Sequence, residues 1–200
     1  MYLFGASGHA KVIIDILTAC DEKIDGLIDD NENITSLMDY PVYHGMYDLS
    51  PILISIGNNL IRKKVSEKLT GVIGKAIHPS AIISTYSTID LGTIVMPGAI
   101  INSDSHIGKH CIINTGASID HECIIDDYVH ISPHATLCGN VSVGEGSWIG
   151  AGAVIIQGVK IGKWSQIGAG SVVTKDIPDN VLAYGNNCKI IRNINKTIYQ

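Results

Sequence analysis

An aliphatic residue stands at every sixth position of the chain from Ile77 to Val173. This ladder has seventeen positions, and isoleucine, valine or leucine fills each of them. A small or slim residue follows four positions after each ladder residue, as far as Ser171. A helix repeats its apolar face about every 3.6 residues and an amphipathic strand about every 2, so a period of six is typical of neither.

A period of six predicts a three-sided coil of short parallel strands. Each strand places its aliphatic residue in a central lumen, and the small residue lets the chain turn the corner. Three hexapeptides form one coil of about 18 residues, and coils stack at the strand spacing of about 4.8 Å. Residues 77–175 then form about five coils, which the rule for parallel crossovers makes right-handed. Residues that tolerate a left-handed backbone are expected near the corners, namely Asn102, Gly108, Asn114, Gly116, Asp120 and Asp126.

The first 76 residues show a different pattern, in which short apolar runs alternate with helical periodicity. Strands are expected at residues 2–4, 24–28 and 52–56, with a short one near Val72-Ile73. Helices are expected after the turn at residues 5–10 and over residues 60–69, whereas residues 31–50 are expected to be irregular. This alternation predicts a small parallel α/β sheet, about half of a doubly wound, Rossmann-like domain. Pro178 ends the hexapeptide period, and residues 176–200 are expected to cap the last coil.

Composition narrows the class of protein. The chain of 200 residues is 46% hydrophobic and 16% charged, with a net charge of −5, which argues against a nucleic-acid partner. The basic triplet Arg62-Lys63-Lys64 is expected on a solvated helix face. An apolar run of 18 residues and a charged leader are both missing, so no membrane contact and a cytoplasmic location are expected. The five cysteines lack C-x-x-C spacing, which argues against a disulfide framework.

A glycine-rich turn leads from the first strand into the first helix. A helix N-terminus offers free N–H groups and partial positive charge to an anion. The dinucleotide fingerprint needs three glycines, but this chain has Gly5, Ser7 and Ala10, which disfavours NAD. Asp29-Asp30 and Gly57 follow the next two strands, and the carboxyl ends of parallel strands open on one crevice. A mononucleotide or a nucleotide-sugar diphosphate is therefore the expected ligand.

Motifs along nearly the whole chain resemble one family of enzymes. Runs such as I-G-K-H-C-I and I-G-A-G-A-V look like hexapeptide-repeat acyltransferases, whose β-helix is left-handed. The order of G-A-S-G-H-A, I-D-D, I-G-N-N-L-I-R-K-K and I-D-H-E-C-I-I is similar to bacterial nucleotide-sugar N-acetyltransferases and sialic acid O-acetyltransferases. The resemblance implies a left-handed parallel β-helix that uses acetyl-CoA, without a metal. It implies N-acetylation of a nucleotide-linked amino sugar, such as a UDP-4-amino-4,6-dideoxy sugar.

The same resemblance implies roles for single residues. The nucleotide sugar would contact Ser7, Gly8, His9, Asp29, Asp30 and Gly57. His121 would be the general base with Glu122 as its orienting partner, and acetyl-CoA would contact His130, Ala151 and Ala169. The chain departs from the family at its C-terminus, where G-x-P-A-K is usual and Gly185-Asn186-Asn187-Cys188-Lys189 stands instead.

The chemistry of His121 and Glu122 supports that role. They are the third and fourth residues of the hexapeptide that begins at Ile119, so both are expected at a corner outside the lumen. Acyl transfer from a thioester to an amine needs a base, and an imidazole suits that task near neutral pH. An adjacent carboxylate fixes the tautomer and favours the imidazolium that forms. Backbone N–H groups at the glycine-rich corners would stabilise the oxyanion.

His130 lies nine residues after His121, which is half a coil around the triangle. Two outward-facing side chains so placed do not converge within one chain, so a shared site implies a groove between neighbouring subunits and a homotrimer. Trp148 and Trp164 would either line the CoA groove or pack at the trimer interface or on the C-terminal tail.

Three alternatives remain open at this point. O-acetylation of a sialic acid or related sugar would need a hydroxyl acceptor. A non-catalytic β-helical scaffold that binds a nucleotide sugar would tolerate loss of His121. A zinc lyase would use His106, His110 and His134, but zinc ligands must converge at about 2.0–2.1 Å from one ion, and the spacing of these histidines does not stack them on successive coils.

Overall fold

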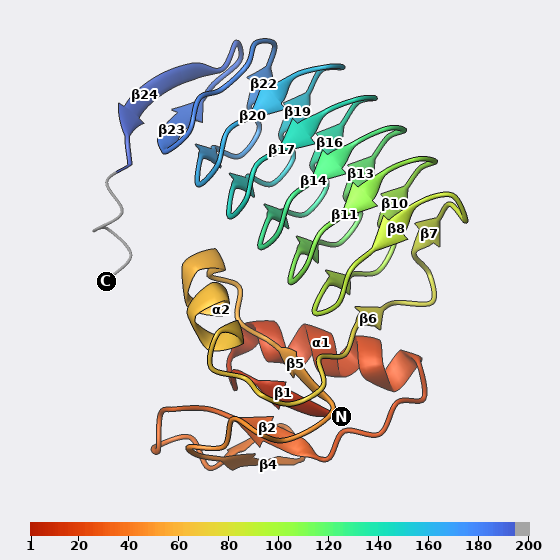
Figure 1. The fold of residues 1–200 in the computed structure, drawn as a ribbon, viewed down its shortest axis with the longest axis vertical. Coiled ribbons are helices and arrows are strands. Elements are labelled where there is room, and N and C mark those ends of the chain that lie inside the picture. The colour runs from red at the N-terminus through yellow and green to blue at the C-terminus, as the bar shows by residue number, and fades with distance from the viewer. Residues whose placement is uncertain (195–200) are drawn as a thin grey trace.

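The computed structural model describes residues 1–194 and has two parts, a small α/β region and a long β-helix above it (Figure 1). The α/β region contains β1 (Tyr2–Phe4), α1 (Gly8–Ala19), β2 (Gly26–Ile28), β3 (Ser36–Leu37), β4 (Tyr40–Tyr43), β5 (Ile52–Ile54) and α2 (Asn59–Ser66). Its strands form one sheet in the order β3-β4-β2-β1-β5. All neighbours are parallel except β3 and β4. Neither helix within residues 1–194 is long and apolar enough to cross a membrane.

Two expectations for the α/β region are wrong. Residues 31–50 are not irregular, because β3 and β4 form a hairpin there and β4 extends the sheet beside β2. The alternation typical of a strand is hard to see in the sequence of β4 because only Val42 of its four residues is buried. The strand expected near Val72-Ile73 is a single bridge between Ile73 and Ile52.

Seventeen two-residue strands wind around the lumen as the hexapeptide ladder predicts. One face contains β6 (Ala76–Ile77), β9 (Ile94–Val95), β12 (Ile112–Ile113), β15 (His130–Ile131), β18 (Trp148–Ile149) and β21 (Gln166–Ile167). The second face contains β7 (Ile82–Ile83), β10 (Ile100–Ile101), β13 (Ser118–Ile119), β16 (Thr136–Leu137), β19 (Val154–Ile155) and β22 (Val172–Val173). The third contains β8 (Thr88–Ile89), β11 (His106–Ile107), β14 (Ile124–Ile125), β17 (Ser142–Val143) and β20 (Lys160–Ile161). We call these the first, second and third faces.

Each ladder residue is the second residue of its strand, and the ladder from Val95 to Val173 is buried in one continuous core. The first residue of each strand points away from the lumen, so it decides what each face presents. The predicted left-handed parallel β-helix is therefore confirmed, and the right-handed coil that the crossover rule favours does not form.

The left-handed corner positions differ from those expected. Every sixth residue from Gly92 to Gly170 has a positive φ, three residues after its ladder residue. Of the six residues expected there, only Gly116 has this conformation. Half of the positions lack glycine, and Glu122 (φ 59°) and His134 (φ 55°) are among them. Non-glycine residues pay a conformational cost at such positions, which points to a role for some of their side chains.

The α/β region packs on the first face of the β-helix. Residues of α1 share one hydrophobic core with Ala76, Ile94, Met96 and Ile112. The outward residues Ile94 and Ile112 are fully buried because α1 covers them. Further along the same face the outward residues are His130, Trp148 and Gln166, beyond the end of that core. α1 therefore covers only the first part of this face, as far as Ile112.

The C-terminal segment continues the first face. β23 (Val181–Tyr184) pairs with β21, and β24 (Lys189–Asn193) pairs antiparallel to β23. The residues that depart from the family pattern form the turn between these strands, where Cys188 N–H donates to the carbonyl of Val172 at 2.9 Å. The expected cap over residues 176–200 falls partly outside the described residues, because the structure describes the chain only to Ile194.

Candidate active site

The turn between β1 and α1 leaves a helix N-terminus open. Ser7 is the N-cap of α1, yet its side chain makes no capping hydrogen bond. Gly5 is needed for the fold, because its φ is 114° and a Cβ there would lie 2.7 Å from Ile56. Gly8 differs, because a Cβ there would meet no atom within 4 Å. Space at Gly8 is therefore open to a ligand beside the free N–H groups of α1.

The two aspartates after β2 do different work. The Asp29 carboxylate accepts hydrogen bonds from Ala6 N–H at 2.8 Å and Asn31 N–H at 2.9 Å, so it holds the glycine-rich turn in place. The exposed Asp30 accepts a hydrogen bond from the Tyr47 hydroxyl at 2.7 Å, which raises the pKa of that phenol. The Asp29 side chain therefore holds the backbone of the glycine-rich turn, whereas Asp30 is exposed to solvent.

His9 and Gly57 face the contact between the α/β region and the β-helix. The Nε2 atom of His9 is buried and makes no hydrogen bond. Burial, assisted by the charge of Arg62, lowers the pKa of His9 to about 4, so its ring is neutral. A Cβ at Gly57 would meet no atom within 4 Å, and its carbonyl accepts a hydrogen bond from Arg62. The structure thus brings Ser7, Gly8, His9 and Gly57 to one side of the sheet, as expected of parallel strand ends.

Arg62 corrects one expectation from the sequence. The triplet Arg62-Lys63-Lys64 is not a solvated face, because Arg62 is fully buried and Lys63 forms an ion pair with Glu145 of the β-helix. Only Lys64 is exposed. One side of α2 contacts the β-helix, and its residues recur at helical spacing. The sequence does not indicate which side of the helix makes this contact.

His121 and Glu122 occupy the corner between β13 and β14. The imidazole Nδ1 lies 3.0 Å from a Glu122 carboxylate oxygen, and the two side chains are 56% and 64% exposed. The ring lies over Gly139 of the next coil, where a Cβ would be only 2.5 Å from Cε1 of His121. Gly139 therefore belongs to the candidate site, although no sequence motif identifies it; it stands eighteen residues after His121, one coil further on.

Hydrogen bonds also fix the backbone of this corner. The Asp120 carboxylate accepts from His121 N–H at 2.9 Å and from the Asn102 side-chain amide at 2.9 Å. The Asn102 hydrogen bond, followed by that of His121, lowers the pKa of Asp120. The Nδ1 proton of His121 faces an acceptor-only carboxylate, so Nε2 is free to take a proton. A cavity of about 500 Å³ lies beside it, lined by Asp120, His121, Cys138, Gly139, Asn140, Gln157 and Gly158.

His130 lies on the first face in a very different environment. It faces away from the lumen as expected, but it is only 8% exposed. Its ring stacks on Trp148 with centroids 5.7 Å apart, and its Nε2 accepts from the Asn114 amide at 3.0 Å. Its other nitrogen therefore carries the proton and hydrogen-bonds the backbone of Gly57. Burial, with smaller effects of Arg62 and His9, lowers the pKa of His130 to about 3.

An apolar groove of about 440 Å³ starts at His130 and follows the first face and its corner. It brings together the three residues expected at acetyl-CoA, His130, Ala151 and Ala169. Trp148 forms part of its wall and donates from Nε1 to the Ser132 hydroxyl at 2.6 Å. Trp164 does not line this groove and instead packs over Gly146 beside Lys63.

The two halves of the expected site do not meet within this chain. The groove at His130 and the cavity at His121 share no lining residue. They lie at different corners of the triangle, one after the first face and the other after the second. A single chain therefore presents a base and a groove on separate surfaces.

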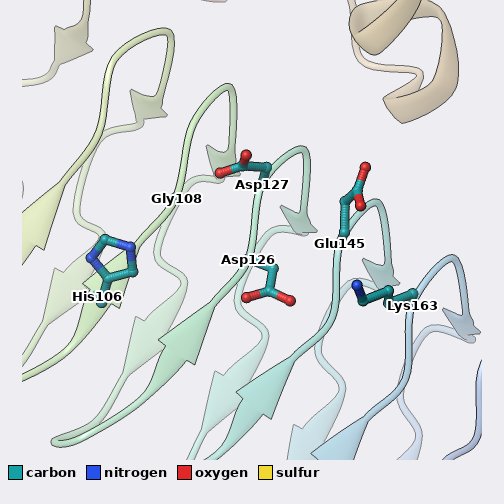
Figure 2. A pocket seen from close by; sticks show the side chains of 6 residues that line it. All are labelled: His106, Gly108, Asp126, Asp127, Glu145 and Lys163. Carbon is teal, nitrogen blue, oxygen red and sulfur yellow. The ribbon is translucent and has the colours of Figure 1, made fainter.

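The histidines of the zinc alternative are also apart. His106 hydrogen-bonds Thr88 at 2.6 Å, His110 stacks on Tyr128, and His134 lies over Gly116. Figure 2 shows His106 separated from Asp127 and Glu145 along a shallow cavity of the third face. Within residues 1–194, no three histidine, cysteine or acidic side chains gather closely enough to hold a metal ion.

Comparisons with known proteins agree with both parts of this architecture. Residues 1–69 match the PglD N-terminal domain family, and residues 104–139 and 140–175 each match the bacterial transferase hexapeptide family. A variant of perosamine N-acetyltransferase from Caulobacter crescentus, solved with CoA and GDP-perosamine, is 38% identical. The match covers 96% of each chain with a TM-score of 0.90.

Two further solved structures are similar over almost the whole chain. The acetyltransferase domain of PglB from Neisseria gonorrhoeae, in complex with acetyl coenzyme A, is 34% identical with a TM-score of 0.87. That match covers 95% of this chain and 98% of the other. WeeI from Acinetobacter baumannii is 28% identical, with the same coverage and a TM-score of 0.83. The chain belongs to the hexapeptide-repeat family of nucleotide-sugar N-acetyltransferases, which confirms the resemblance seen in its motifs.

Proposed function

We propose that this protein transfers the acetyl group of acetyl-CoA to the amino group of a nucleotide-linked amino sugar. The observation that carries the proposal is the His121–Glu122 pair, whose hydrogen bond leaves Nε2 free beside an open cavity. The perosamine N-acetyltransferase and PglB structures, which contain CoA or acetyl-CoA, support the choice of donor. A scaffold would have no use for an oriented imidazole, and no feature of the site favours a hydroxyl acceptor.

The α/β region is proposed to hold the nucleotide sugar through Ser7, Gly8, His9, Asp30 and Gly57. The open N-terminus of α1 suits a diphosphate, and the empty space at both glycines allows close approach. Asp29 keeps its proposed place in the pocket by holding the backbone of the turn. A UDP-4-amino-4,6-dideoxy sugar is the proposed acceptor class. The similar perosamine N-acetyltransferase was solved with a GDP-linked sugar, so the test includes more than one base.

The proposed reaction needs no covalent enzyme intermediate. The sugar amine attacks the thioester carbon, and His121 takes the amine proton at Nε2 as the tetrahedral intermediate forms. The Glu122 carboxylate stabilises the resulting imidazolium. Collapse of the intermediate expels the CoA thiolate, which takes the proton from the imidazolium. Amide and free thiol are the products, and His121 returns to its neutral state.

The active site is proposed to lie between subunits of a homotrimer. His130, Ala151 and Ala169 would bind acetyl-CoA on one subunit, while His121 and Glu122 would come from its neighbour. The separation of the groove and the cavity within one chain supports this arrangement. A cytoplasmic location is also proposed, because all five cysteines are free thiols, which suits a reducing compartment.

Activity is tested with acetyl-CoA and a set of UDP-, GDP- and dTDP-linked amino sugars, with release of CoA thiol as the signal. The same nucleotide sugars with hydroxyl in place of amine serve as matched controls. We expect thiol release with at least one amino sugar and a product that resists hydroxylamine, which cleaves esters but not amides. Thiol release with only the hydroxyl sugars would show O-acetylation and contradict the proposal.

The assembly is tested by mixing two inactive variants. Light scattering should give about three times the chain mass of 21.4 kDa. Co-expressed His121→Ala and Ala169→Trp chains should regain activity, since a mixed trimer contains interfaces with both an intact base and an intact groove. Mixed trimers without activity would place the whole site within one chain.

A further inference from the structure

Arg62 is the largest fully buried side chain of the described structure, and it joins the two parts of the molecule. Its Nε donates to the carbonyl of His110 at 2.7 Å. One Nη donates to the backbone carbonyl of Tyr128 at 2.9 Å and to the side-chain oxygen of Asn59 at 2.8 Å. The other Nη donates to the carbonyls of Ile56 and Gly57 at 3.0 and 3.1 Å. All five N–H groups of the guanidinium are thus satisfied.

The acceptors come from the two regions that the proposed site must bring together. Ile56 and Gly57 follow β5 in the proposed substrate site, whereas His110 and Tyr128 stand at the same corner of two successive coils of the β-helix. Both corner residues have a positive φ (53° and 60°), so their carbonyls are turned outward in a conformation that non-glycine residues seldom adopt. Gly57 in turn contacts His130 at the start of the acetyl-CoA groove.

The charge of Arg62 has no anionic partner. Among the ion pairs of residues 1–194, none includes Arg62, and its acceptors are carbonyl and amide oxygens. Its three histidine neighbours, His9, His110 and His130, are neutral, since burial and the Arg62 charge lower their pKa values, and a neutral imidazole supplies no negative charge. Burial lowers the pKa of Arg62 itself only to about 10, so it stays charged.

A buried cation without an anion is an unfavourable way to join two parts of a protein. Apolar side chains of similar volume usually serve stability as well or better. The positive charge therefore needs a reason other than stability, and the pocket beside it supplies one. Ser7, Gly8 and His9 begin α1, whose N-terminus adds its own partial positive charge.

We propose that Arg62 is a positioning residue that fixes the substrate pocket against the β-helix and supplies the positive charge that the substrate diphosphate neutralises. The proposal rests on the function proposed above and deepens it. Arg62 donates all its hydrogen bonds to the protein, so it acts on the diphosphate through space rather than by contact. The anion that balances the buried charge would be part of the substrate, and the free protein would hold an excess of positive potential there.

The test compares a charged ligand with its uncharged counterpart. Dissociation constants for UDP and uridine, and for GDP and guanosine, are measured by calorimetry on the full chain. The diphosphate preference is the ratio of the nucleoside constant to the nucleoside diphosphate constant. Arg62→Gln should lower this ratio by at least about tenfold, as expected for loss of one poorly screened charge. Lys64→Gln removes an exposed charge from the same helix and should change it less than about twofold.

The outcomes separate the two proposals. Binding of neither diphosphate by the unchanged protein would overturn the proposed function itself. If Arg62→Gln folds and keeps the same diphosphate preference as the unchanged protein, the proposed role of Arg62 is wrong. The proposed enzyme function would not be affected. In the expected case, KM for the nucleotide sugar rises in the variant while KM for acetyl-CoA stays within about twofold.

A second variant covers the case in which Arg62→Gln does not fold. Arg62→Lys keeps a cation, but a buried lysine without an anion loses its proton more easily than arginine. Its diphosphate preference should therefore fall between pH 6.5 and pH 9 relative to the unchanged protein measured over the same range. Parallel profiles for the two proteins would overturn the proposal.

Discussion

Two histidines nine residues apart, His121 and His130, have opposite surroundings. The side chain of His121 is 56% exposed and its only side-chain partner among the described contacts is Glu122. His130 is 8% exposed, stacks on Trp148 and is held by Asn114 and Gly57. The imidazole of His121 is open to solvent, whereas that of His130 is held in place and neutral. Both residues are histidines, and the fold places them in different environments.

The difference follows from their places on the triangle. His121 stands on a corner, where the chain turns into solvent and only the next coil lies beside the ring. His130 begins a strand of the first face, the face on which the α/β region packs. Burial on that face penalises the charged imidazole and lowers the pKa of His130.

The largest expected effect is loss of the base. His121→Ala removes an exposed side chain and leaves the lumen untouched, so the thermal midpoint should stay within a few degrees. kcat/KM should fall by about 10²–10⁴, the usual worth of a positioned general base. His121→Gln serves as a control of similar size. Retention of most activity in both variants would remove His121 from the mechanism.

Acid should destabilise the folded protein through its buried histidines. The pKa values of His130 (about 3), His9 and His110 (about 4) are lowered on folding, so the unfolded chain binds more protons below about pH 6.5. The free energy of unfolding should therefore fall as pH drops from about 6.5 towards 4, by up to about 1.4 kcal/mol per pH unit for each histidine.

Urea unfolding at pH 7 and pH 5 measures this slope. His130→Gln should reduce the slope by about one proton even if it lowers stability at both pH values. Equal slopes for the parent and His130→Gln would show that His130 is not buried as a neutral group in solution.

A substitution at Gly8 should weaken binding of the nucleotide sugar without changing binding of acetyl-CoA. Gly8→Val places a side chain in space that is empty in the structure, at a position where φ is not left-handed, so folding should be unaffected. KM for the nucleotide sugar should rise about tenfold, while KM for acetyl-CoA should not change. Gly8→Ala is the matched smaller change with a smaller expected effect. A rise in KM for acetyl-CoA would refute the division of labour between the two regions.

The smallest expected effect is that of Glu122→Gln. The change keeps the size of the side chain and one acceptor oxygen for Nδ1 of His121, but it removes the charge that stabilises the imidazolium. kcat should fall severalfold, less than in His121→Ala. Saturating-donor kinetics for both variants in parallel provide the comparison. A loss as large as that of His121→Ala would mean that Glu122 itself transfers the proton.

The sequence by itself determined the β-helix, because a strict period of six admits few other arrangements of seventeen aliphatic residues. It also placed His121 and Glu122 outside the lumen, since the ladder fixes the register of every corner. Strands β3 and β4 and the left-handed positions could not be predicted from it. These two short strands bury too little for alternation to show, and the corner conformation is set by the turn geometry rather than by residue type.

Only the tertiary structure decided which outward residues are covered. Ile112, His130 and Trp148 have equivalent places in the period, yet α1 covers the first, Gly57 meets the second and the third remains half exposed. Arg62 stands beside Lys64 in one basic triplet, and the packing of α2 buries one and leaves the other in solvent. The period of six reflects contacts inside the β-helix. Burial on its outer faces depends on the α/β region, whose contact residues follow no such period. The neutral histidines and the unpaired charge at Arg62 are consequences of that docking.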